Sequence, residues 1–440
     1  MDQWNERVAQ RKVTVGVIGQ GYVGLPLALV FEEAGFEVVG LDVDTRKVDA
    51  LMRGESYIKH IGPERVARAL SRGRYQASAD FDRLRSCDAI VICVPTPLGP
   101  HREPDNSYIH ATAREIGKRL RPGQLVVLES TTYPGTTDEE VRPLLEAASR
   151  LVCGKDFLLA FSPEREDPGR KDHTTKTIPK IVGGVNRAST DAAVALYGAA
   201  LDAVVPVSSA RVAESSKLLE NVFRSVNIAL VNELKMIFDR MDIDIWEVIR
   251  AASTKPFGFM PFYPGPGLGG HCIPLDPFYL AWKAAEHGEW ARFIELAGEV
   301  NTRMPRWVVD KLADALNAQG KAVHGSRVLV LGLAYKANVD DDRESPSYEI
   351  LEQVGKRGAK VDYCDPHFPV THPTRRHDLG LASVPCDAAT FASYDAVVVA
   401  TAHDLFKKPD LFRRARLVVD TRNLVGPLFP DGDGPPVVKA

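Results

Sequence analysis

The sequence predicts an α/β protein with two doubly wound domains joined by a long central helix and a helical region. A β-branched run enters a glycine-rich turn near the N-terminus, and a similar order of strand and helix returns after residue 327. One helical pattern of about eight turns lies between them. At 440 residues the chain is too long for one ordinary core, since a domain has roughly 100–200 residues.

The composition is that of a soluble globular protein. Hydrophobic residues make up 45% and charged residues 26%, and the formal charge of -3 gives no electrostatic reason to expect nucleic acid. The polar N-terminus and the lack of any apolar run of about 18 residues predict a cytoplasmic protein with no membrane partner. The six cysteines form no CxxC pair, so neither a disulfide framework nor a metal site is expected.

The N-terminal segment has the pattern of one βαβ unit. A β-branched strand over 12–18 meets three glycines spaced as GxGxxG, and an apolar helical pattern leads to a second strand over 37–44. Gly19 permits the tight turn, Gly21 lets a pyrophosphate approach the backbone, and Gly24 allows close packing of helix on strand. The helix N-terminus then faces phosphate, which predicts a Rossmann-like domain.

Asp42 ends the second strand, 18 residues after Gly24. A carboxylate at this place accepts hydrogen bonds from the adenosine ribose hydroxyls and repels a 2′-phosphate. The sequence therefore predicts NAD rather than NADP as cofactor. A glycine-rich turn in an ordinary α/β domain is the alternative.

Three further strands end in polar residues, and the strands are expected over 88–97, 125–135 and 158–164. Their carboxyl ends carry Thr96, Thr132 and Glu164, which are expected to line the crevice where doubly wound sheets bind ligands.

The second Rossmann-like half begins with a strand at Arg327 and has another strand ending at Asp365. It lacks GxGxxG, because Gly332 stands alone, and Lys336 follows at the turn from strand to helix. Lys336 suits a nucleotide phosphate or a carboxylate, with a surface lysine as the equal alternative. This half is expected to bind a different ligand from the first.

The central helix begins near Val212 and has two faces. Its apolar stripe predicts support for both domains and a homodimer or larger assembly, formed chiefly across 212–240. Glu214, Lys217, Asn221 and Arg224 share the other face. They form either a solvated face or, for Lys217 and Asn221, part of a catalytic cleft. The stripe consists of Leu218, Leu219, Val222, Phe223, Val226, Leu230 and Leu234.

The segment PGPGLGGHCIPLDP carries one cysteine, Cys272, on what is expected to be a flexible loop. A lone cysteine is more often a small buried hydrophobe. Here the glycines allow close approach of a ligand, and His271 and Asp276 supply ionisable groups. A thiol that adds to an aldehyde makes a tetrahedral centre able to lose hydride, so Cys272 beside a dinucleotide domain predicts a four-electron dehydrogenase.

At these motifs the chain resembles the UDP-glucose/GDP-mannose dehydrogenase family over about residues 13–425, and it is most similar to the bacterial UDP-N-acetylglucosamine 6-dehydrogenase branch. The motifs are GQGYVGLPLA, ESTTYPGTT, AESSKLLENVFRSVNIALVNEL, the cysteine segment, YKANVDDDRESPS and DTRN. The resemblance implies that Cys272 is the nucleophile, that Asp276 assists the water or thiol, and that Lys217 and Asn221 bind the sugar oxygens that acquire charge. It also implies that Lys336 contacts the UDP-sugar, that Arg343 lies near the cofactor and that Arg422 anchors the far side of the site.

These arguments give three sets of candidate residues. The catalytic set is Thr132, Glu164, Lys217, Asn221, Cys272 and Asp276. The cofactor set is Gly19, Gly21, Tyr22, Val23, Gly24, Asp42, Lys47, Pro95, Thr96, Thr132 and Arg343. The substrate set is Glu164, Arg165, Lys217, Asn221, Tyr263, Gly265, Gly269, Lys336 and Arg422.

The chain departs from the UDP-glucose enzymes at three places. Pro168 replaces the usual glutamate, which leaves Glu164, Glu166 or Asp167 as the general base. His271 replaces a serine and Leu275 replaces a frequent lysine. The expected substrate is therefore a UDP-N-acetylhexosamine, with UDP-N-acetylglucosamine first and UDP-N-acetylmannosamine or UDP-glucose as alternatives.

Three domains are expected: 1–206 for NAD, 207–320 for the central helices, dimerisation and the cysteine segment, and 321–440 for the UDP-sugar. The product would be a uronic acid for surface polysaccharide, such as lipopolysaccharide O-antigen. A two-electron NAD dehydrogenase of the hydroxyacid or 6-phosphogluconate type would leave Cys272 and the second nucleotide-like half unexplained. A nucleotide-binding sensor without turnover is the alternative outside enzymes.

Overall fold

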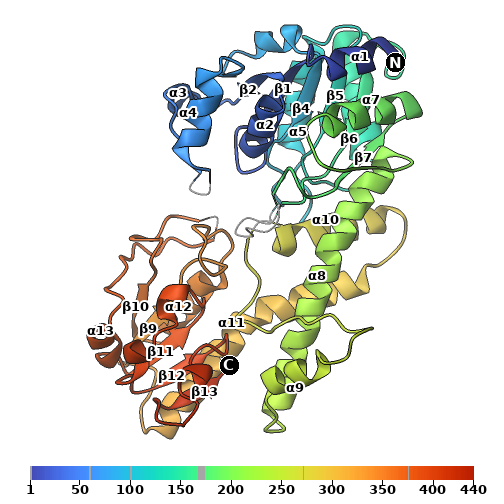
Figure 1. The fold of residues 1–440 in the computed structure, drawn as a ribbon. Helices are drawn as coiled ribbons and strands as arrows, with labels where there is room; N and C mark the ends of the chain where they lie inside the picture. Colours follow the sequence, from blue (N-terminus) through green and yellow to red (C-terminus); the bar gives the residue numbers. More distant parts are fainter. Residues whose placement is uncertain (1, 59–60, 100–101, 167–173, 271, 375) are drawn as a thin grey trace. The chain divides into compact units, whose positions relative to one another are not determined.

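The computed structural model describes residues 2–58, 61–99, 102–166, 174–270, 272–374 and 376–440. The chain divides into two compact units (Figure 1). Unit 1 comprises Met1–Glu220 and Phe278–Trp290, and unit 2 comprises Asn221–Pro277 and Ala291–Ala440. Each unit contains a largely parallel sheet between helices, which confirms the predicted α/β fold class.

The sheet of unit 1 has the order β3-β2-β1-β4-β5-β6-β7-β8. All neighbouring strands are parallel except β6 and β7, which run antiparallel. The bounds are β1 Thr14–Ile18, β2 Glu37–Leu41, β3 Tyr75–Ser78, β4 Ala89–Ile92, β5 Leu125–Leu128, β6 Leu158–Phe161, β7 Lys180–Gly184 and β8 Val204–Pro206. A strand is therefore confirmed at each of the five places predicted before residue 165, but each observed strand is shorter than predicted, since β5 for example ends at Leu128 and not at 135.

Helices cover both faces of this sheet. Val15 and Val17 pack into one core with residues of α1, α2, α4 and α7, whereas Ile18 packs into the other core with α5 and α6. The strands are apolar on both sides because successive side chains point to opposite faces. The helical bounds are α1 Asp2–Ala9, α2 Gly24–Glu33, α3 Thr45–Met52, α4 Pro63–Ser71, η1 Phe81–Ser86, α5 Ser107–Gly117, η2 Thr136–Val141, α6 Arg142–Ser149 and α7 Arg187–Gly198.

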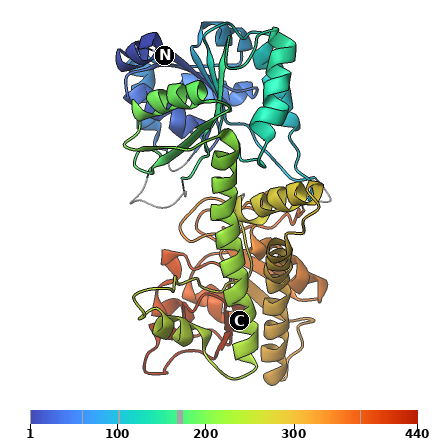
Figure 2. The same ribbon diagram turned by 90° about the vertical axis from the view of Figure 1, so that its right-hand side faces the viewer.

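The predicted central helix is α8, Ala210–Asp239, which runs without interruption (Figure 2). Glu214, Lys217 and Asn221 are buried and Arg224 is exposed, so the solvated-face reading is wrong for the first three. The reason is tertiary packing, which spacing along one helix does not reveal. Two other helices accompany α8, namely α9 Ile245–Ala252 and α10 Cys272–Glu286. No helix among the described residues is long and apolar enough to cross a membrane.

Unit 2 contains the second predicted Rossmann-like half, with a parallel sheet of order β10-β9-β11-β12-β13. Residues of α11 and α12 pack on one face of the sheet, and α13, η3 and α14 pack on the other. The bounds are α11 Arg292–Ala318, β9 Arg327–Leu331, α12 Pro346–Lys356, β10 Lys360–Cys364, α13 Ala388–Ala392, β11 Ala396–Val399, η3 Asp404–Phe406, α14 Pro409–Phe412, β12 Val418–Asp420, η4 Gly426–Leu428 and β13 Val437–Lys439.

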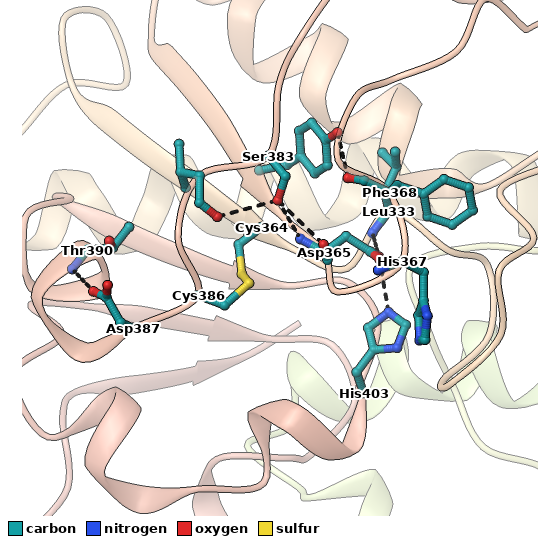
Figure 3. Close-up of a disulfide and its surroundings, with 12 residues drawn as sticks. Leu333, Cys364, Asp365, His367, Phe368, Ser383, Cys386, Asp387, Thr390 and His403 are labelled. Atoms are coloured by element: carbon teal, nitrogen blue, oxygen red, sulfur yellow. Dashed lines mark hydrogen bonds and ion pairs between the residues drawn. A yellow bond between two sulfur atoms is a disulfide. The ribbon is translucent and has the colours of Figure 1, made fainter.

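A disulfide joins Cys364 to Cys386 in unit 2 (Figure 3). No disulfide is expected from the sequence, and this pair corrects that prediction. The two residues are 22 positions apart and belong to no spacing motif. They meet because the chain returns to the end of β10, where the Val384 N–H donates to the Tyr363 carbonyl at 2.9 Å.

Reducing this disulfide is expected to lower the unfolding free energy of unit 2 by about 3 kcal/mol, because the bond closes a loop of 22 residues. Thermal unfolding with and without dithiothreitol measures the effect. Cys386→Ser should abolish the response to reductant, and the matched variant Cys153→Ser in unit 1 should keep it. An unfolding temperature that ignores reductant in the unaltered chain would contradict the expectation.

Candidate functional site

The glycine turn of unit 1 leaves space for a dinucleotide. Gly19 has φ +91, and a Cβ there would lie 2.3 Å from the Cys93 carbonyl oxygen. A Cβ at Gly24, the first residue of α2, would lie 1.8 Å from the Gly19 oxygen. A Cβ at Gly21 would meet nothing within 4 Å, so this position is open to an incoming group. The turn therefore fits a pyrophosphate at the N-terminus of α2.

Asp42 follows β2 and is buried beside that turn. Its carboxylate accepts the backbone N–H of Gln20 and of Asp44, each at 2.9 Å, and lies 3.5 Å from the Lys47 ammonium. A carboxylate accepts about four hydrogen bonds, so these contacts orient Asp42 without exhausting it. The Tyr57 hydroxyl donates to the Gln20 carbonyl. The arrangement fits an adenosine ribose, as predicted for NAD.

Two of the predicted threonines are buried and already bonded within unit 1. The Thr96 carbonyl accepts the hydroxyl of Tyr279, and the Thr132 hydroxyl lies 2.7 Å from that of Thr136. Tyr279 lies in α10, so a residue far along the chain holds the segment that follows β4. Among the other cofactor candidates, Tyr22 and Pro95 are both exposed.

Glu164 follows β6, and its side chain is held from two sides. One carboxylate oxygen accepts the backbone N–H groups of Arg165 at 2.7 Å and Glu166 at 2.5 Å, and the other lies 3.4 Å from the Lys180 ammonium. Burial raises the pKa of Glu164, but the charges of Lys180 and Lys217 and the two backbone donors outweigh it, so the net pKa is below the ordinary value. Glu164 is thus an ionised carboxylate.

The neighbours of Glu164 in sequence have other partners. The Arg165 guanidinium lies 2.7 Å from Glu220 and donates to the Pro179 carbonyl, whereas Glu166 accepts the hydroxyl of Thr175. Asp167 and Pro168, which bear on the choice of general base, lie outside the described residues.

Glu214, three residues before Lys217 on α8, anchors that helix within unit 1. Its carboxylate accepts the backbone N–H of Gly135 at 2.7 Å and of Thr137 at 2.9 Å, and also the Thr137 hydroxyl at 2.6 Å. Burial raises the pKa of Glu214 to about 7, against the lowering effect of these hydrogen bonds. Helical spacing identified the face but not this role as a structural acceptor.

We expect Glu214 to make the stability of unit 1 fall as pH rises. Its pKa is about 7 in the folded chain and ordinarily 4.5 for a glutamate in water, so the folded state holds the extra proton between these values. That difference corresponds to about 3 kcal/mol, lost between about pH 4.5 and about pH 7. Glu214→Gln should remove the slope in urea unfolding, and Glu37→Gln, at an exposed site, should retain it. An unchanged slope in Glu214→Gln would rule out this assignment.

In unit 2 the structure brings Asn221 and Asp276 together. The Asn221 amide donates to the Asp276 carboxylate at 2.7 Å, and both side chains are buried. Cys272 is exposed and lies four residues before Asp276 in α10, so the two share one face of the helix. Three predicted catalytic residues are thus placed around the start of α10.

Cys272 and Asp276 do not lie on a loop as predicted, because α10 begins at Cys272. Proline in a first helical turn lacks only an N–H that has no partner there, so Pro274 is compatible with the helix. Pro277 lies inside α10, where a proline removes one helical hydrogen bond, and the helix continues past it. His271 lies outside the described residues.

The glycines before Cys272 pack against the segment that carries Lys336 and Arg343. A Cβ at Gly269 would lie 2.4 Å from the Tyr335 Cβ, and the Gly270 N–H donates to the Arg343 carbonyl at 2.8 Å. The Arg343 guanidinium pairs with Asp341 at 2.6 Å, and Lys336 is partly buried. Unit 2 thus brings the cysteine segment to the predicted ligand turn.

Arg422 and Gly265, both predicted to bind substrate, also meet in unit 2. A Cβ at Gly265 would lie 2.4 Å from the guanidinium of Arg422, which donates to the Ala400 carbonyl at 2.9 Å. Burial lowers the pKa of Arg422 to about 10, against the raising effect of Asp420. Tyr263 stacks on Trp246 at 5.7 Å between ring centroids.

Sequence reasoning missed the buried asparagines that hold the cysteine segment. The side-chain Oδ1 of Asn232 accepts the Gly265 N–H at 3.0 Å, and its side-chain Nδ2 donates to the Oδ1 of Asn301 at 2.9 Å. Asn301 in turn donates to the Ser225 carbonyl at 3.1 Å. Asn232 lies 11 residues after Asn221 on α8. Three helical turns separate them, and this spacing is a signal that could have found Asn232.

The second Rossmann-like half has a carboxylate, Asp365, at the place that Asp42 occupies in the first half, but the surroundings of the two carboxylates differ. Asp365 follows β10 and accepts the N–H groups of Leu333 and Ala334, as Asp42 does for Gln20 (Figure 3). However, the His403 ring nitrogen lies 3.1 Å from Asp365, and both side chains are fully buried. Asp365 is therefore sealed from a ribose, which agrees with the prediction that this half binds differently.

A glycine turn that fits a dinucleotide, a second nucleotide-type fold and an exposed cysteine one helical turn from a buried carboxylate indicate an NAD-dependent oxidoreductase. Three family descriptions match the chain in order: the NAD binding domain at 13–201, the central domain at 211–303 and the UDP binding domain at 329–427 of the UDP-glucose/GDP-mannose dehydrogenase family. The chain belongs to this family, whose members oxidise nucleotide sugars with NAD, and the predicted resemblance is confirmed.

Individual relatives cover nearly the whole chain. The UDP-N-acetyl-D-glucosamine 6-dehydrogenase of Salmonella typhi is 35% identical over 399 residues, with 90% of this chain and 91% of that protein covered. The enzyme of the same name from Pseudomonas aeruginosa is 36% identical over 398 residues, with 90% and 92% covered. The solved UDP-N-acetyl-D-mannosamine dehydrogenase of Pyrococcus horikoshii aligns with a TM-score of 0.85 at 33% identity, covering 94% of this chain and 96% of that one.

Proposed function

We propose that this chain oxidises C6 of a UDP-N-acetylhexosamine, UDP-N-acetyl-D-glucosamine foremost, to the uronic acid by a four-electron reaction. The observation that carries the proposal is the exposed Cys272 at the start of α10, one turn from an Asp276 bound to Asn221. The names of the relatives from Salmonella typhi and Pseudomonas aeruginosa support the N-acetylglucosamine substrate. The product would serve surface polysaccharide synthesis.

The residues would divide the reaction as follows. NAD, when bound at the glycine turn, accepts a hydride in each of the two oxidations. In the first, the C6 hydroxyl gives its proton to a base, for which Glu164 is the ionised candidate. Lys217 and Asn221 would stabilise the negative charge that develops on the sugar oxygen.

Cys272 would carry the second oxidation. Its thiolate adds to the C6 aldehyde and forms a C–S bond, which yields a thiohemiacetal that loses hydride to become a thioester. Water, assisted by Asp276, then attacks the acyl carbon, the C–S bond breaks and the thiol is regained. One alcohol and one water thus become a carboxylate, with two hydrides and three protons released.

The substrate is tested by the yield of NADH from UDP-glucose, UDP-N-acetylglucosamine, UDP-N-acetylmannosamine, UDP-N-acetylgalactosamine and GDP-mannose. We expect two NADH per UDP-N-acetylglucosamine and a uronic acid as product. The mannosamine sugar is the second candidate, because the Pyrococcus horikoshii protein bears that name. One NADH per sugar would favour the two-electron alternative, and none would favour a sensor.

We also propose a homodimer formed chiefly across residues 212–240. Leu219, Phe223 and Leu230 on α8 are 67%, 46% and 50% exposed, which leaves apolar surface on one side of a long helix. Phe223→Glu combined with Leu230→Glu should give monomers in sedimentation at micromolar concentration. Val152→Glu, at a 52% exposed site in unit 1, should leave the dimer intact. A monomeric unaltered chain would refute the proposal.

A further inference from the structure

A buried set of charges lies beside Glu164 in unit 1. The Lys180 ammonium is 2.7 Å from the Glu129 carboxylate and 3.4 Å from that of Glu164. The side chains of Lys180 and Glu129 are 4% and 0% exposed, and that of Glu164 is 14% exposed. Glu164 is therefore the member of the set that reaches the surface of unit 1.

The sheet topology explains this arrangement. Glu129 directly follows β5 and Glu164 follows β6, so both lie at the carboxyl edge of the parallel strands. Because β7 runs antiparallel to β6, its first residue, Lys180, returns to the same edge. The register pairs Phe161 with Gly183, and continuing it sets Glu164 opposite Lys180. Ligands of doubly wound sheets bind at this edge.

The other groups that face the set distinguish its two carboxylates. Glu164 accepts two backbone N–H groups and feels the charge of Lys217, while Glu129 accepts the Tyr197 hydroxyl. The Arg165 guanidinium pairs with Glu220, and the partly buried Cys93 side chain interacts electrostatically with all three charged members of the set. Glu129 and Glu164 therefore share the Lys180 ammonium, but their other hydrogen-bond donors and neighbouring charges differ.

As a consequence, the pKa values of Glu129 and Glu164 shift in opposite directions. Burial raises the pKa of Glu129 above its ordinary value despite Lys180, whereas the pKa of Glu164 lies below its ordinary value. An opposite charge within about 4–6 Å lowers the pKa of a carboxyl by about 1–3 units. Lys180 thus has a role at Glu164 beyond pairing with Glu129.

We propose that Lys180 is a positioning residue: its ammonium, shared between Glu129 and Glu164, keeps the Glu164 carboxylate ionised and fixed at the ligand-binding edge of the sheet. The negative charge of Glu129 offsets part of the stabilising effect of Lys180 on the ionised form of Glu164. The inference rests on the proposed function, because Glu164 is useful in ionised form if it takes a proton from the sugar hydroxyl.

Substitution of Lys180 and substitution of Glu129 should shift the acidic limb of the pH profile in opposite directions. Lys180→Met removes the cation, so the acidic limb of the pH profile of kcat/KM should shift upward by about one unit or more. Glu129→Gln removes the competing anion, so the limb should shift downward. A purely structural role would lower activity in both variants without opposite shifts.

Further variants separate these effects from folding. Lys180→Met leaves Glu129 buried without its cation, so the double variant Lys180→Met with Glu129→Gln provides a neutral pair that should fold. Its limb should lie above that of Glu129→Gln alone. Lys180→Arg keeps the charge and should restore a near-normal limb. Arg74→Met, which removes a cation 3.1 Å from the buried Glu32, should leave the limb in place.

A direct titration distinguishes failure of this inference from failure of the proposed function. The Glu164 carboxyl is followed by 13C NMR in glutamate-labelled protein, and its signal is assigned by its loss in Glu164→Gln. The same upward and downward shifts are expected without substrate. If no UDP-sugar reduces NAD, the proposed function fails while this titration still decides the role of Lys180. Equal Glu164 titration in Glu129→Gln and in the double variant would overturn the inference.

Discussion

Cys272→Ala is expected to lose acid formation by about 1,000-fold or more while a weak first oxidation survives. Oxidation of the alcohol to the aldehyde needs a base and a hydride acceptor but no sulfur. A bare aldehyde carbonyl, however, cannot surrender hydride until a nucleophile has added to it. The measurement is the separate yield of aldehyde, uronic acid and NADH from UDP-N-acetylglucosamine.

Cys272→Ser gives the sharper result. A serine hydroxyl can still add to the aldehyde, but the second oxidation then leaves an ester, which transfers its acyl group to water less readily than a thioester. Mass spectrometry after incubation with NAD and UDP-N-acetylglucosamine should show protein heavier by one UDP-sugar acyl group. Cys153→Ala is the matched control, since this partly buried cysteine of unit 1 is placed in no catalytic step. Acid formation at the unaltered rate by Cys272→Ala would refute the covalent mechanism.

Lys217→Ala is expected to lower turnover about 100-fold or more, which is the effect of removing one donor to a developing oxyanion. Lys217 is buried on α8, and its charge also helps to lower the pKa of Glu164. The acidic limb of the pH profile should therefore rise together with the fall in turnover. Steady-state kinetics across pH measures both effects.

Lys235→Ala is the matched control for Lys217→Ala. Lys235 is another buried lysine of α8, but its ammonium donates to the Lys439 carbonyl at 3.1 Å and lies 3.7 Å from Asp239. Its loss should reduce stability and spare turnover. If Lys217→Ala behaved in the same way, Lys217 would be a structural residue.

Several features of the site were predictable because they depend on local chemistry. The turn at Gly19, Gly21 and Gly24 requires residues without a Cβ, and Asp42 has a fixed place at the end of the next strand. The long helix was predictable from its periodicity. Which of its faces is buried was not, since both faces of α8 contain apolar residues.

Other features follow from contacts between residues distant in sequence. Cys364 meets Cys386, Asn221 meets Asp276 across 55 positions, and Asn232 holds Gly265. No spacing rule relates such pairs, because the chain between them can take any path that the packing of strands and helices allows. The start of α10 at Cys272 could not be predicted from the sequence either, because prolines such as Pro274 are compatible with a loop as well as with a first helical turn.

The sequence by itself determined the fold class, the NAD-binding turn and the identity of the thiol and carboxylates, because backbone sterics, side-chain periodicity and functional-group chemistry are local properties. Only the tertiary structure decided that Lys180 is shared between two carboxylates. The antiparallel return of β7 places Lys180 between Glu129 and Glu164, and burial at that sheet edge strengthens the interaction among their charges.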